Sequence, residues 1–205
     1  MSGKIALQAS PMSLFEASGS RKYLNPVERR RFFHAVDKLP PDKRLFCLVT
    51  AWSGGRVSEI LALTPLAFDI DAGTVAIETL KRRRGGIIRQ VALPPEVIAG
   101  LARVFHLRRM QRGADARMMR LWPWSRVTAW RCIKRVMCAA GISGGAASPK
   151  GLRHTFGVSA FEANVPPHLV QRWLGHASLR TTAIYGDVVG REERKFASRM
   201  WRRRR

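Results

Sequence analysis

Over residues 68–93 the apolar residues follow the pattern of β-strands, whereas elsewhere they recur at the spacing of helices. This change determines the predicted fold class. Two runs inside this segment, residues 74–77 and residues 87–93, have the β-branched composition of strands. Arg83-Arg84-Gly85-Gly86 lies between them and predicts a turn, so the two runs should form a small antiparallel sheet. The flanking segments are helical in pattern. We therefore predict a mainly α protein with a small antiparallel β-sheet, an α+β fold.

Three helices are predicted before the sheet. Asn25-Pro26-Val27-Glu28 combines an N-cap residue, a first-turn proline and a first-turn acid, which together mark a helix start. A second helix runs to about Trp52 and ends at Gly54-Gly55. The third is short and stops before Pro65, so Arg56 is expected at a helix start beside a turn.

Helices dominate again after the sheet. Pro94-Pro95-Glu96 starts a helix with a core-facing stripe, made of Val97, Ile98, Leu101, Val104 and Phe105. Another helix should begin at Ser125 and close at Gly141, followed by a flexible loop over residues 143–148. From Pro149 onward the pattern is helical, with breaks at Asn164, Pro166-Pro167 and Gly175.

The chain divides into three parts. Residues 1–22 are small, polar and weakly patterned, and we expect a flexible leader there. Residues 23–190 hold enough apolar material for one folded domain with its own core. Residues 191–205 are predicted to form a basic C-terminal helix or tail, which ends in four arginines.

The charge of the chain points to a polyanionic partner. Lys and Arg number 37 against 14 acidic residues, a formal net charge of +23. So large an excess of positive charge is self-repulsive in a compact protein, and a polyanion would relieve the repulsion. Nucleic acid is therefore the first candidate partner. Three cysteines in apolar, helical runs (Cys47, Cys132 and Cys138) suggest reduced, buried thiols and a cytoplasmic protein. No apolar stretch approaches the length of a membrane span.

Four separated segments carry residues suited to phosphate chemistry. They are Ser53-Gly54-Gly55-Arg56-Val57-Ser58-Glu59-Ile60-Leu61, Gly151-Leu152-Arg153-His154-Thr155-Phe156, Leu174-Gly175-His176, and Thr181-Thr182-Ala183-Ile184-Tyr185. Each is weak evidence alone, because an Arg and a Glu one helical turn apart are common as a salt pair. The order and spacing of all four are specific.

Together these segments resemble the tyrosine recombinase (phage integrase) family, over about residues 23–189. The resemblance implies a catalytic domain that cleaves and rejoins DNA strands at specific sites through a 3′-phosphotyrosyl intermediate. It implies that Tyr185 is the nucleophile and that Arg56 and Arg153 hold the two non-bridging phosphate oxygens. The phosphotyrosyl link keeps the bond energy, so no ATP is needed. The residue set supplies the nucleophile and its electrostatic support, and neither a cofactor nor a metal is expected.

The resemblance also implies supporting roles. His176 would donate a hydrogen bond to a phosphate oxygen, and Glu59 would orient Arg56 or a neighbouring basic group. Lys81, before the basic turn, would protonate the departing 5′-oxygen. A basic turn that contacts DNA phosphates explains the run Lys81, Arg82, Arg83 and Arg84 about as well.

Lys150 departs from the family pattern, which usually has a histidine three residues before Arg153. We hypothesise that Lys150 occupies that position, as a base toward Tyr185 or as a charge that stabilises its phenolate. His154 is one step further along the helix than Arg153 and should point elsewhere, so we expect it to serve packing.

Partners and context follow from the resemblance. Double-stranded DNA is the expected partner, with a homo-tetramer at synapsis and a nucleoid-associated location in the cytoplasm. The tail is expected to dock on a neighbouring protomer, with its terminal arginines (Arg202, Arg203, Arg204 and Arg205) on the DNA backbone. Most family members carry an additional N-terminal clamp domain, and residues 1–22 are too short to be one.

Two other functions remain open at this stage. A type IB topoisomerase shares this chemistry and can carry lysine at the position of Lys150. A non-catalytic DNA-binding regulator would keep the fold and the charge without the reaction.

Overall fold

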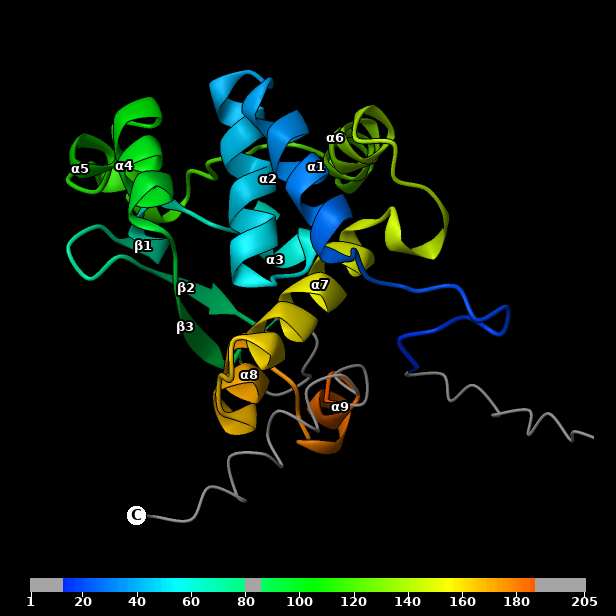
Figure 1. Ribbon diagram of the computed structural model, residues 1–205. Coiled ribbons are helices and arrows are strands. Elements are labelled where there is room, and N and C mark those ends of the chain that lie inside the picture. The colour runs from blue at the N-terminus through cyan, green and yellow to red at the C-terminus, as the bar shows by residue number, and fades with distance from the viewer. Residues whose placement is uncertain (1–12, 80–85, 187–205) are drawn as a thin grey trace, which may run out of the picture.

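The computed structural model describes residues 13–79 and 86–186 of the chain (Figure 1). Its helices are α1 (Pro26–Asp37), α2 (Pro41–Ser53), α3 (Val57–Leu61), α4 (Pro95–Val104), α5 (Leu107–Met110), α6 (Arg126–Ala139), α7 (Pro149–Glu162), α8 (Pro167–Leu174) and α9 (Arg180–Ala183). Its strands are β1 (Phe68–Asp69), β2 (Thr74–Glu78) and β3 (Ile88–Ala92). Short 3₁₀ turns cover Pro65–Ala67, Ala114–Arg117 and Gly144–Ala146. The predicted α+β fold is confirmed.

Local sequence signals start and stop the first helices as predicted. Asn25 caps α1. Its side-chain oxygen accepts a hydrogen bond from the Glu28 backbone amide at 2.8 Å, and its backbone amide donates to the Glu28 carboxylate at 2.8 Å. Gly54 ends α2 in the left-handed region, with φ 61°. The chain therefore turns sharply at Gly54 and places Arg56 at the N-cap of α3.

The three strands form one antiparallel sheet in the order β1-β2-β3. Val75 pairs with Val91 and Ile77 pairs with Arg89. Val75, Ile77 and Val91 are buried, as the alternation predicts, and Arg89 lies on the same buried face with 3% of its surface exposed. The sheet thus carries a charged side chain into the interior, toward the end of α8.

The core lies between α2 and the helices around it. Figure 1 shows α2 between α1 and α4, with α7 crossing beneath and leading to α8 and α9. The predicted stripe of α4 packs there, and Trp122 is buried against Phe46 and Phe105. Within the described ranges, no helix combines the length and the apolar character needed to cross a bilayer.

Three expectations differ from the structure. Residues 13–22, expected in the leader, are partly folded: Phe15 and Arg21 form a β-bridge, and Leu14 is buried in a cluster with Tyr23 and Tyr185. Residues 143–148 contain a packed 3₁₀ turn. Of the three free cysteines, Cys47 is buried, Cys132 is half-buried and Cys138 lies on the exposed side of α6.

Candidate active site

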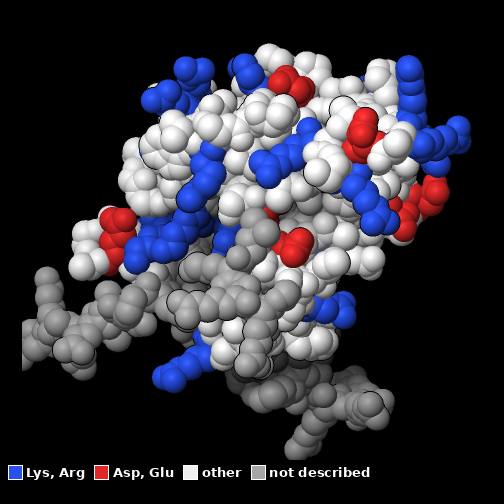
Figure 2. Space-filling model, turned by 180° about the vertical axis from the view of Figure 1, so that it is seen from behind, with Lys and Arg blue, Asp and Glu red and all other residues white. Residues whose placement is uncertain are grey.

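A cavity of about 1050 Å³ opens between the start of α3, the start of α7 and the segment around α9. Its wall brings together the predicted residues of all four motifs, namely Arg56, Glu59, Lys150, Arg153, His154, His176 and Tyr185. Among the described residues that line it, Arg56, Lys150 and Arg153 outnumber the one carboxylate, Glu59, so the cavity is a basic site assembled from distant parts of the chain. Figure 2 shows Lys and Arg side chains at more places on one face of the molecule than Asp and Glu side chains.

Arg56 is aimed by the turn that precedes it. A Cβ on Gly54 would come within 2.6 Å of the Phe156 ring, so the turn packs closely against α7. The Glu59 carboxylate accepts a hydrogen bond from the Arg56 backbone amide at 2.9 Å and forms an ion pair with the Arg56 guanidinium at 2.7 Å. The predicted pair between Arg56 and Glu59 is therefore present. The Arg56 side chain keeps 31% of its surface exposed, which leaves it able to meet a ligand.

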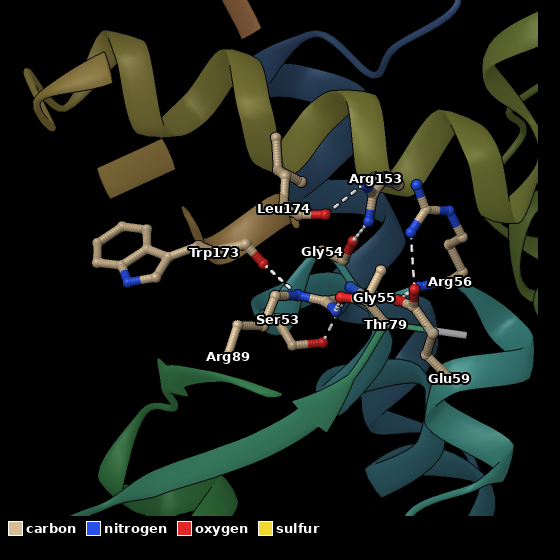
Figure 3. Close-up of polar contacts among 10 residues, drawn as sticks. All are labelled: Ser53, Gly54, Gly55, Arg56, Glu59, Thr79, Arg89, Arg153, Trp173 and Leu174. Atoms are coloured by element: carbon tan, nitrogen blue, oxygen red, sulfur yellow. Dashed lines mark hydrogen bonds and ion pairs between the residues drawn. The ribbon is translucent and has the colours of Figure 1, made fainter. Parts of the chain in front are cut away.

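Arg153 is buried and joins three segments of the chain. Its guanidinium donates to the carbonyl of Gly54 at 2.7 Å and to the carbonyl of Leu174 at 2.6 Å (Figure 3). Burial, and then the nearby charge of Arg56, lower the pKa of Arg153 to about 10, so it stays charged at neutral pH. A guanidinium has five N–H donors, so these two bonds do not exhaust those of Arg153, which also lines the cavity.

A buried ion-pair network that sequence reasoning missed stands behind Arg56. Arg89 pairs with Glu59 at 2.6 Å and donates to the Thr79 hydroxyl and to the Trp173 carbonyl, at 2.9 and 2.7 Å (Figure 3). Although burial alone would raise the pKa of Glu59, Arg89 and the hydrogen bonds from Arg56 bring it below its ordinary value. Glu59 thus holds Arg56 from one side and Arg89 from the other. The sequence contains one signal for this network: Arg89 lies two residues before the apolar Val91 in the same strand, so both side chains belong to the same face of the sheet.

His176 follows the C-terminus of α8 and is held there by backbone geometry. Gly175 is left-handed, with φ 64°, and the His176 amide donates to the Gln171 carbonyl at 3.1 Å. The Nδ1 atom of His176 lies 2.9 Å from the Thr182 hydroxyl. Burial, together with the charges of Arg153 and Arg56, lowers the pKa of His176 to about 3, so the ring is neutral at physiological pH.

Tyr185 lines the cavity beside His176. Its ring is stacked on that of His176, with centroids 6.1 Å apart and an interplanar angle of 12°. Only 1% of the residue is exposed, and burial raises its pKa, while Arg153 and Arg56 act in the opposite sense. The phenol is therefore enclosed, and it lies within the field of the two arginines.

His154 corrects the sequence expectation. Its Nδ1 atom lies 3.3 Å from the Tyr185 hydroxyl, so it faces the cavity and does not serve packing alone. Lys150, His154 and Gly157 occupy positions i, i+4 and i+7 of α7 and share the face on which Tyr185 lies. Burial and the nearby charge of Lys150 lower the pKa of His154 to about 4. Lys150 itself is exposed at the cavity wall.

The remaining predicted residues lie outside the part of the chain that the structure describes. They are Lys81, Arg82, Arg83 and Arg84 of the basic turn, and Arg202, Arg203, Arg204 and Arg205 of the tail.

Comparison with known proteins gives consistent matches. Residues 22–190 match the model of the phage integrase family. The chain is 28% identical over 172 residues to the tyrosine recombinase XerA of Pyrococcus furiosus, covering 80% of this chain and 57% of that protein. It is 36% identical over 147 residues to the tyrosine recombinase XerD of Mycobacterium tuberculosis, covering 67% of this chain and 45% of that protein. The chain thus spans about half the length of the curated relatives it matches.

Solved structures agree in fold. The crystal structure of XerA recombinase matches with a TM-score of 0.70 at 25% identity, covering 89% of this chain and 66% of that one. A pre-cleavage complex of the XerH site-specific recombinase with its difH substrate matches with a TM-score of 0.67 at 25% identity, covering 80% and 50%.

Proposed function

Because this chain belongs to the phage integrase family, we propose that it is a site-specific DNA recombinase that cuts and rejoins strands through Tyr185. One observation carries the proposal: Arg56, Arg153 and Tyr185, from three distant segments, line the same cavity. A planar guanidinium suits the non-bridging oxygens of a phosphodiester because it offers paired donors and stays charged. Two of them around one phosphate would stabilise the charge that develops in the transition state.

The proposed reaction is a transesterification. The Tyr185 oxygen attacks phosphorus, the bond from phosphorus to the 5′-oxygen breaks, and the 3′-phosphate is left on the tyrosine. The departing 5′-oxygen takes a proton from Lys81, and the phenol releases its own proton to solvent in the open cavity. A 5′-hydroxyl from the partner strand then reverses the step and releases Tyr185. We keep Lys150 as the group that balances the phenolate charge, beside His154, which contacts the hydroxyl.

The proposed partner is double-stranded DNA in a homo-tetrameric synapse. The net charge of +23 supports binding to a polyanion, and the matched XerH structure is a complex with its difH substrate. Arg82, Arg83 and Arg84 are proposed to contact the backbone, as are Arg202, Arg203, Arg204 and Arg205 from a tail exchanged between protomers. Such an enzyme would work at the nucleoid, in the cytoplasm.

Covalent capture tests the proposal without knowledge of the site. Nicked duplexes with a randomised central sequence are incubated with the protein, and complexes that survive denaturation are recovered and sequenced. The wild type and Tyr23→Phe should yield adducts enriched in one sequence, and Tyr185→Phe none. Absence of any adduct would overturn the proposal and favour a non-catalytic DNA-binding regulator. Adducts without sequence preference, with relaxation of arbitrary supercoiled plasmid, would favour a topoisomerase.

A further inference from the structure

Thr182 is a fully buried polar residue next to the catalytic cavity. It lies in α9, has no exposed surface, and its hydroxyl oxygen is 2.9 Å from Nδ1 of His176. Thr50 and Thr155, two other buried threonines, instead donate to carbonyls four residues back, at 2.8 and 2.7 Å. Within residues 13–79 and 86–186, the hydrogen-bond partner found for the Thr182 hydroxyl is the imidazole.

This contact decides which nitrogen of His176 carries the proton. A neutral imidazole has one N–H and one lone pair, so its two nitrogens play opposite roles. The ring is neutral because burial and the arginines hold its pKa at about 3. Either Nδ1 accepts from Thr182 and Nε2–H serves the cavity, or Nδ1–H donates to Thr182 and Nε2 offers a lone pair there.

The first arrangement satisfies both residues. If Thr182 accepted from His176, its own hydroxyl hydrogen would be buried without an acceptor among the described residues, which is costly in a protein interior. A lone pair on Nε2 would also repel the oxygens of a phosphate held by Arg56 and Arg153. With Thr182 as the donor, the hydroxyl is satisfied and Nε2–H is available to a phosphate oxygen.

We propose that Thr182 is a positioning residue that donates to Nδ1 of His176 and so directs Nε2–H into the cavity; the catalytic consequence rests on the function proposed above. The same contact links His176 to the nucleophile. The Tyr185 amide donates to the Thr182 carbonyl at 3.1 Å, so the threonine and the tyrosine belong to one backbone turn. A displacement of that turn moves Tyr185 and the anchor of His176 together.

Nitrogen NMR on the protein without DNA tests the tautomer directly. Long-range ¹⁵N–¹H spectra of the five histidines are recorded for the wild type, Thr182→Ser and Thr182→Val, with His176→Gln to assign the signals. We expect Nε2 of His176 to be protonated in the wild type, and Nδ1 to be an unprotonated hydrogen-bond acceptor. Thr182→Ser should keep the Nδ1 signal, and Thr182→Val should shift it. A protonated Nδ1 in the wild type, or the same Nδ1 signal in Thr182→Val, would overturn the proposal.

Cleavage kinetics test the consequence, on the duplex enriched by covalent capture. Thr182→Val should slow adduct formation by about ten- to a hundredfold, the scale seen when the group that orients a metal-bound histidine is removed. Thr182→Ser should restore most of the rate. In a His176→Gln background, Thr182→Val should have little further effect, because its target is already absent. An equal loss in both backgrounds would assign Thr182 a general structural role and overturn the positioning role. If no variant forms an adduct, the proposed function fails while the NMR result still decides the tautomer.

Discussion

The ring of Tyr185 lies directly against the backbone of Gly157 in α7. A Cβ at position 157 would come within 2.6 to 2.7 Å of three ring atoms, so only a glycine leaves room for the tyrosine there. A glycine inside a helix normally destabilises it by roughly 0.5–1 kcal/mol relative to alanine. The enclosed position of the proposed nucleophile therefore depends on the absence of a side chain on α7.

Gly157→Ala should displace Tyr185 from α7. Because burial is the main cause of its raised pKa, a displaced and better hydrated phenol should titrate at lower pH than in the wild type. The measurement is the titration of the ¹³Cζ signal in a Tyr23→Phe background, where Tyr185 is the one tyrosine left. Ser159→Ala, on the same helix at a different cavity, is the control. An unchanged pKa in Gly157→Ala would show that α7 accommodates the methyl group without moving Tyr185.

Glu59→Gln should destabilise the protein strongly. The side chains of Glu59 and Arg89 are 0% and 1% exposed, so the substitution leaves a buried guanidinium without its counter-charge. Removal of one partner from a buried pair costs about 3–5 kcal/mol of the free energy of unfolding. The exposed pair between Asp71 and Arg108 provides the control, since Asp71→Asn should cost about 0–1 kcal/mol. Urea denaturation measures both, and equal costs would contradict a structural role for the Glu59 network.

The sequence predicts the parts of the site that local motifs encode. Arg56 could be placed because a left-handed glycine and a short helix surround it, and His176 because it follows a glycine at a helix end. Arg89 and His154 could not, because their partners come from distant segments. Arg89 is held in the interior by Glu59, Thr79 and the Trp173 carbonyl, and His154 contacts Tyr185 where Gly157 lets the ring approach that face of α7.

Lys150→Ala should slow formation of the covalent adduct. Lys150 lines the cavity on the same face of α7 as His154, and its charge favours both the phosphate and the phenolate. We expect a loss of about a hundredfold, the lower range for removal of one group that stabilises charge in the transition state. Lys38→Ala, an exposed lysine at the end of α1, is the charge-matched control. If Lys150→Ala cleaved fully and His154→Gln lost most of its activity, His154 and not Lys150 would be the group that assists Tyr185.

The two cavity histidines should make the folded state sensitive to mild acid. The pKa values of His154 and His176 are lowered to about 4 and about 3, mainly by burial, whereas an unfolded histidine titrates near about 6.5. As the pH falls below about 6.5, protons bind preferentially to the unfolded chain, so stability is lost down to about pH 4 for His154 and further for His176. Above about 6.5 both states are neutral at these positions and the effect vanishes.

His154→Gln should therefore show a shallower loss of stability between about pH 6.5 and about pH 4.5 than the wild type, because glutamine takes up no proton in this range. His176→Gln should behave in the same way, and His34→Gln, an exposed histidine of α1, is the control for loss of the residue type. The measurement is the urea midpoint of each protein at several pH values. Parallel profiles for the wild type and both cavity variants would mean that these imidazoles are accessible to protons in the folded state. The neutral His176 on which the role of Thr182 depends would then be lost below about pH 6.5.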